Sequence, residues 1–109
     1  MTKKVTDNAA LLAYLAHAVE SARKEQIGFG ERAAKDVANA IQWHADGALR
    51  ATFTENYAKT TLAMIKSGQD LRLVYDNLID RLTVIASGDS MIAETRALAV
   101  FARSLKDWL

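Results

Sequence analysis

The chain contains no cysteine and no proline, and only five of its 109 residues are glycine. The absence of cysteine excludes disulfides, thiolate nucleophiles and cysteine-ligated zinc, and it favours a reducing, cytoplasmic compartment. The absence of proline and the shortage of glycine remove most turn and edge-strand signals, which favours helices throughout. Aromatic residues make up only 7% of the chain, so a core must be built from aliphatic residues and alanine.

Hydrophobic residues make up 50% of the chain and charged residues 25%, which is the balance of an ordinary folded protein. We expect one domain over residues 1–109, able to bury roughly two-thirds of the surface that the unfolded chain exposes. The net charge is +1 and the two signs are interspersed, which disfavours a nucleic-acid partner because such proteins carry a basic stripe. The apolar runs are too short to span a bilayer, so no membrane interaction is predicted.

The first half of the chain predicts two helices joined by a glycine-containing turn. Apolar residues at three- and four-residue spacing indicate a helix over residues 8–26. The stretch Ile27-Gly28-Phe29-Gly30 is typical of a helix end and a tight turn, with both apolar side chains in the core. A second helix then begins near Glu31, and the residues predicted to form its buried stripe are Ala34, Val37, Ala38 and Ile41.

The stretch Gln42-Trp43-His44-Ala45-Asp46-Gly47 lies where the second helix is hardest to place. On one straight helix, the side chains of Ile41 and Phe53 would point about 120° apart, so the apolar residues would not lie on one side of the helix. We therefore expect a break or kink between Asp46 and Thr54. Beyond it, Thr52 and Glu55 fit a capping box at the start of a further helix.

The second half of the chain has clearer signals for where helices begin and end. Ser67-Gly68 indicates a helix end, and Asp70 is a suitable N-cap for a helix with the cleanest apolar stripe of the sequence, formed by Leu71, Val74, Tyr75, Leu78, Leu82 and Ile85. Ser87-Gly88 ends that helix, and Asp89 or Ser90 opens the last one. The predicted fold is an all-α, compact bundle of four or five antiparallel helices with short Gly/Ser/Asp connections and a radius of gyration of about 13 Å.

A metal or small-ligand site built from His17, His44 and Asp46 remains an alternative function. On a continuous helix His44 and Asp46 point about 200° apart, so they share an ion only if the helix has ended there. If the first two helices pair around a turn at residues 27–30, His17 lies roughly one helical turn from the level of His44. Phosphoryl transfer at His44 is less favoured, because an acid follows it where a cation should stabilise phosphate.

No constellation of residues predicts an enzyme, and no cofactor is expected. Gly28-Phe29-Gly30 is a lone glycine pair that follows a helix, whereas phosphate-binding loops follow a strand. Asp76 and Asp80 lie one turn apart, which is more typical of a solvated, charge-alternating face than of a catalytic pair. A second alternative is weak nucleic-acid binding by the last helix through Arg96, Arg103 and Lys106.

The preferred hypothesis is binding to another protein, to a second copy of the chain, or to both. The last helix is apolar on more than one side, so it needs a second surface, either as a central helix of the bundle or in a partner. We predict a non-enzymatic interaction module that forms a homodimer, such as an inhibitor, adaptor or chaperone-like regulatory protein of a bacterial or phage accessory kind. The predicted partner-binding residues are Met91, Ile92, Val100, Phe101, Leu105, Trp108 and Leu109.

Overall fold

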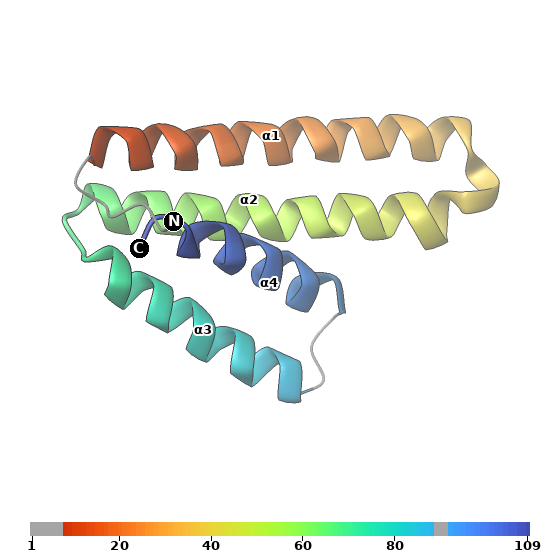
Figure 1. The fold of residues 1–109 in the computed structure, drawn as a ribbon. Coiled ribbons are helices and arrows are strands. Elements are labelled where there is room, and N and C mark those ends of the chain that lie inside the picture. Colours follow the sequence, from red (N-terminus) through yellow and green to blue (C-terminus); the bar gives the residue numbers. More distant parts are fainter. Residues whose placement is uncertain (1–7, 89–91) are drawn as a thin grey trace.

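The computed structural model describes residues 8–88 and 92–109 (Figure 1). Within these residues there are four α-helices and no strand, which confirms the prediction of an all-α helical bundle. The helices are α1 (Asn8–Lys35), α2 (Ala45–Lys66), α3 (Leu71–Ser87) and α4 (Ile92–Lys106). No helix in this described part of the chain is long and apolar enough to cross a membrane.

The two longest helices form a hairpin, in which α2 returns beside α1 (Figure 1). Their connection contains a short 3-10 helix, η1 (Val37–Asn39), and a single π-helical turn, η2 (Ala40–His44). Helix α4 packs on α2, and α3 packs mainly on α4. The connection through η1 and η2 contacts only the two hairpin helices, so α3 and α4 leave this end of the hairpin uncovered.

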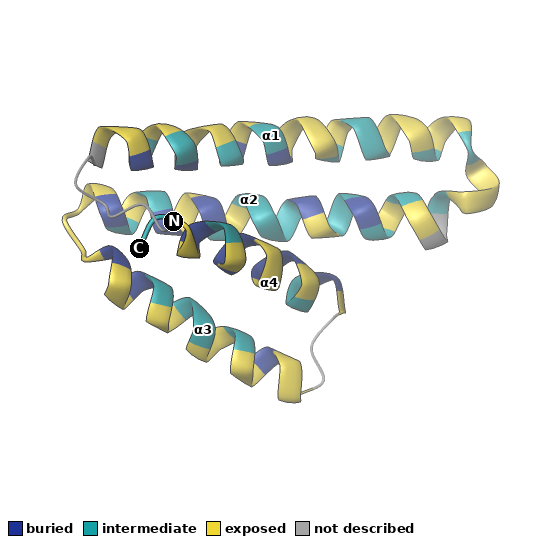
Figure 2. Ribbon diagram, in the orientation of Figure 1, coloured by how far each residue is buried: buried dark blue, intermediate teal, exposed yellow. Residues whose placement is uncertain are grey.

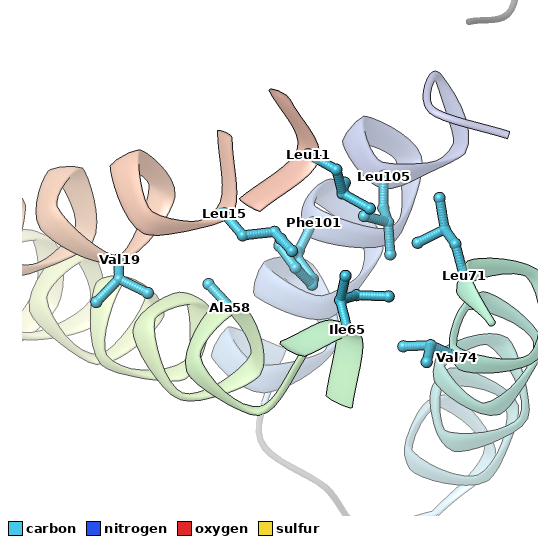
Figure 3. Close-up of a cluster of buried hydrophobic side chains, with 9 residues drawn as sticks. All are labelled: Leu11, Leu15, Val19, Ala58, Ile65, Leu71, Val74, Phe101 and Leu105. Atoms are coloured by element: carbon cyan, nitrogen blue, oxygen red, sulfur yellow. The ribbon is translucent and has the colours of Figure 1, made fainter. Parts of the chain in front are cut away.

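The core lies where α1, α2, α3 and α4 converge at the open end of the hairpin. Figure 3 shows Phe101 of α4 beside Leu15 of α1, and Leu105 beside Leu11. Residues at three- and four-residue spacing share one helical face. In the predicted apolar stripe of α1, Leu12 is half-buried and the other members are buried: Leu11, Leu15, Val19 and Ala22. The buried cluster consists of Leu11, Leu15, Val19, Ala58, Ile65, Leu71, Val74, Phe101 and Leu105.

The predicted boundary between α2 and α3 is confirmed. Gly68 has a φ of 91°, a left-handed conformation that glycine adopts without steric cost. The backbone N–H of Gly68 donates to the carbonyl of Ile65, and that of Gln69 donates to the carbonyl of Met64. Asp70 then caps α3, since its carboxylate accepts from the Leu73 amide at 3.3 Å. The predicted start of the last helix, at Asp89 or Ser90, lies outside the described residues.

The predicted boundaries in the first half are wrong. Helix α1 continues through Gly28 and Gly30 to Lys35, and α2 runs without interruption from Ala45 through Gly47. The chain reverses instead around Asp36, whose backbone (φ −125°, ψ 72°) leaves the helical region. A glycine inside a helix costs only about 1 kcal/mol, which packing between two long helices readily offsets.

Thr52 and Glu55 therefore lie inside α2 and form no capping box there. The Thr52 hydroxyl donates to the carbonyl of Ala48 at 3.0 Å, one turn earlier in the same helix. Glu55 faces α1, where it accepts from Arg23 and Gln26.

The molecule is elongated, with extents of 47 × 31 × 27 Å and a radius of gyration of 15.1 Å, against about 13 Å for a compact chain of this length.

A polar junction fixes where α4 begins on α2. The hydroxyl of Tyr57 donates to Glu94 at 2.7 Å, and Arg81 of α3 lies 3.7 Å from the same carboxylate. Residues 45–56 of α2 extend about 18 Å beyond this junction, and this length accounts for the elongated shape.

Candidate functional site

The end of the hairpin beyond the junction is the candidate interaction surface, and we refer to residues 27–47 as the hairpin tip. Helix α1 has no buried residue after Ala22. Figure 2 shows the corresponding segment as exposed or half-exposed, whereas the buried segments of α1 lie toward α4. Two helices can bury only the sides that face each other, so the remaining faces of the tip meet solvent.

Large apolar side chains are exposed on the tip. Ile27 is 63% exposed, Val37 77% and Trp43 61%. The predictions that Ile27 lies in the core and that Val37 belongs to a buried stripe are therefore wrong, and Ala34 and Ala38 of the same predicted stripe are also exposed. The side chain of Ile41 lies outside the described part of the structure. Exposed large apolar side chains make the tip a candidate contact surface.

A short polar network closes the tip. The Asp36 carboxylate accepts from the Asn39 side chain at 3.0 and 3.2 Å and lies 3.2 Å from Nε2 of His44. These contacts to Asn39 and His44 lower the pKa of Asp36, because they favour its charged form. His44 is thus a structural residue of the turn, held against Asp36, and it is largely shielded from solvent.

Close packing of Phe29 on Gly47 holds the two helices together behind this turn. Gly47 is buried, and a Cβ atom at this position would lie 2.4 to 2.7 Å from the Phe29 ring. The guanidinium of Arg32 lies over the same ring, 4.3 Å from its centroid. The glycine therefore lets the aromatic ring approach the α2 backbone, which sets the spacing of the helices at the tip.

An ionic cluster around Glu55 marks the inner limit of the tip. Its carboxylate accepts from Arg23 at 2.6 Å and from Gln26 at 2.7 Å, and Lys59 lies 3.2 Å away. Hydrogen bonds from Gln26 and Arg23 lower the pKa of Glu55 from 4.5 to about 2. Because both donors lie on α1, the cluster also fixes the register of the hairpin.

That register separates the three residues of the predicted metal site. Since positions 23 and 26 of α1 meet Glu55, His17 lies level with roughly position 62 of α2, about 27 Å along the hairpin from His44. His17 instead contacts the Ser21 hydroxyl at 3.3 Å, and Asp46 pairs with Arg50 at 3.0 Å. Among the described residues, no three histidine, aspartate or glutamate side chains gather as metal ligands do.

The predicted partner-binding residues of α4 divide into two groups. Ile92 and Val100 are exposed, at 68% and 70%. Phe101 and Leu105 are 3% and 0% exposed and belong to the core of the chain itself, so contacts within one chain account for their burial. Trp108 and Leu109 are half-buried and pack against the same core, with the Trp108 ring 5.2 Å from that of Tyr14. Met91 lies outside the described residues.

The three cations of the nucleic-acid alternative, Arg96, Arg103 and Lys106, are all exposed on α4. Arg96 and Arg103 share one helical face because they lie about two turns apart. Ile92 and Val100 are interspersed with them along this exposed side, so the face is mixed rather than a continuous basic stripe.

Sequence reasoning missed the tip as a surface because it placed the reversal of the chain too early. A signal was present in Asp36 and Asn39, two residues that favour turns and cap helices through their side chains.

Comparison of the chain with protein-family models, with curated proteins and with solved structures finds no match.

Proposed function

We propose that this chain is a non-enzymatic protein–protein interaction module that forms a homodimer through its hairpin tip. The observation that carries this proposal is the exposure of Ile27, Val37 and Trp43 on a part of the hairpin that α3 and α4 do not reach. Tryptophan is the residue most enriched among side chains that dominate binding energy at protein interfaces. The tip thus exposes one aromatic and two large aliphatic side chains.

A second copy of the chain is the occupant that fits this surface. The tip carries two cations, Arg32 and Lys35, and three anions, Glu31, Asp36 and Asp46. This near-neutral mixture allows two identical surfaces to approach without strong repulsion and to form pairs of opposite charge around a two-fold axis. A strongly charged partner gains little from such a surface.

Two tips that overlap in opposite directions form a four-helix arrangement, which buries the faces that a two-helix hairpin leaves open. The overlap of two tips is limited to the length of residues 27–35 of α1, about 14 Å, and the width of two helices, or roughly 300 Å² of projected area per copy. Standard stable interfaces bury about 800 Å² on each partner. The proposed dimer is therefore of modest strength, with a dissociation constant in the micromolar range.

Sedimentation velocity over a series of protein concentrations tests this proposal. We expect the wild-type chain to shift from monomer to dimer in the micromolar range, and Trp43→Ser to weaken dimerisation at least about tenfold, because it removes the anchor. Val84→Ser is the matched control, since Val84 is equally exposed, at 63%, but lies on α3. A chain that stays monomeric into the millimolar range, or a dimer that Val84→Ser weakens and Trp43→Ser does not, contradicts the proposal.

A further inference from the structure

A groove with a volume of about 360 Å³ lies where α1, α2 and α4 meet, away from the hairpin tip. Over the described residues the backbones of α1 and α4 do not pack directly on each other. Side chains bridge them instead, through a hydrogen bond between the hydroxyls of Tyr14 and Ser104 and through the contact of Tyr14 with Trp108. The small residues Ala18 and Ala22 of α1 leave the space beside this bridge open.

The groove has an apolar lining with polar groups around it. Val100 and Phe101 of α4 supply the larger apolar side chains. Hydroxyl groups of Ser21, Thr54 and Ser104 also line it. The Thr54 hydroxyl donates to the carbonyl of Arg50 at 2.9 Å, so its oxygen keeps a lone pair that can accept a hydrogen bond from a ligand. Sites of this size and lining bind small organic molecules.

The residues that line the groove carry one negative charge and no positive one. Glu25 is the one ionisable carboxylate among the described lining residues, and none of them is lysine, arginine or histidine. Glu25 forms no ion pair in the part of the chain that the structure describes, whereas its neighbour on α1, Glu20, pairs with Arg23 at 3.0 Å. A single carboxylate beside apolar walls attracts a cationic ligand and repels an anionic one.

We propose that this groove binds a small organic cation, a primary amine attached to one aromatic or aliphatic body. The ammonium group pairs with Glu25 and donates to the hydroxyl oxygen of Thr54 or Ser21, as a primary ammonium has three N–H donors. The apolar body lies against Val100 and Phe101. A bare metal ion fits less well, because one carboxylate supplies too few ligands.

Titration with phenethylammonium, followed by amide chemical shifts, tests this proposal. Two analogues of the same shape serve as comparisons: neutral 2-phenylethanol and anionic phenylacetate. For a ligand of this size we expect a dissociation constant near 1 mM for the cation. The neutral analogue should bind roughly fivefold more weakly and the anion not at all. The shifts should centre on Ser21, Glu25, Thr54 and Ser104.

Two variants assign the effect to the groove. Glu25→Gln should weaken the cation by about fivefold and leave the neutral analogue unchanged, because only the charge is removed. Glu31→Gln is the matched control, since Glu31 is an exposed acid on the same helix that does not line the groove. Ala18→Leu should reduce binding of both ligands by filling the space, with the helical circular dichroism spectrum retained.

Several results overturn the proposal. They are the absence of binding at about 10 mM phenethylammonium, binding of phenylacetate as tight as that of the cation, or equal effects of Glu25→Gln and Glu31→Gln. The Trp43→Ser variant should bind the amine as the wild type does, because Trp43 does not line the groove. The ligand site and the dimer are thus tested separately, and either can fail without the other.

Discussion

Replacement of Gly47 by alanine tests the packing that sets the helix spacing at the hairpin tip. For a helical glycine with open space around it, alanine adds about 1 kcal/mol of stability through helix propensity. Gly47 has no such space, because the new Cβ would lie 2.4 to 2.7 Å from three atoms of the Phe29 ring. Relief of this overlap requires the ring or the helices to move, at a cost of about 1–3 kcal/mol. We therefore expect Gly47→Ala to lower the free energy of unfolding by about 1 kcal/mol.

The sign of this effect should reverse once the ring is gone. In a Phe29→Ala background, Gly47→Ala should raise the free energy of unfolding by about 1 kcal/mol, which gives a coupling energy of roughly 2 kcal/mol between the two sites. Urea unfolding followed by circular dichroism measures the four proteins of this double-mutant cycle: the wild type, the two single variants and the double variant. All are measured at one protein concentration, because self-association adds stability. Gly30→Ala is the control, since a Cβ there meets nothing within 4 Å and should stabilise. If Gly47→Ala stabilises the wild type as much as Gly30→Ala does, the reasoning is refuted.

Two further predictions concern the ionic cluster around Glu55, between α1 and α2, and the N-cap of α3. Because the pKa of Glu55 is lowered from 4.5 to about 2, its contribution to stability is complete above pH 4.5 and is lost as the pH falls toward about 2. The stability difference between wild type and Glu55→Gln should shrink over that range, and a difference independent of pH contradicts this. Asp70→Ala should cost about 1 kcal/mol of unfolding free energy and Asp70→Ser much less, since serine is also a good N-cap. Equal losses in the two variants, measured by urea unfolding, argue against the cap.

The features that sequence predicted correctly are those that local chemistry determines. Ser67-Gly68 and Asp70 specify a helix end and a helix start through backbone conformation and one side-chain acceptor, and neither depends on distant residues. The same holds for the apolar stripe of α1, because helical spacing alone puts Leu11, Leu15 and Val19 on one face. The all-α fold follows from such local signals repeated along the chain.

The first half of the chain depends on contacts that local reasoning does not contain. Gly28 and Gly30 resemble a helix end, but α1 continues through them because α2 packs along its whole length. Gly47 also resembles a helix end. It lies inside α2, however, and contacts the ring of Phe29, eighteen positions earlier in the chain. Whether a glycine ends a helix or admits a neighbour is decided by tertiary packing, which composition and periodicity do not reveal.

The position of the chain reversal accounts for both of the largest errors at the candidate site. A turn at residues 27–30 would bring His17 near His44 and would bury Val37, as sequence reasoning predicted. Because the turn lies at residues 36–44, the facing register is shifted: His44 contacts Asp36, and His17 lies level with a distant part of α2. The same shift lengthens the hairpin beyond the reach of α3 and α4, which are too short to cover it. Residues that would have filled a compact core, Ile27 and Val37 among them, are thereby left on the surface that we propose as the dimer contact.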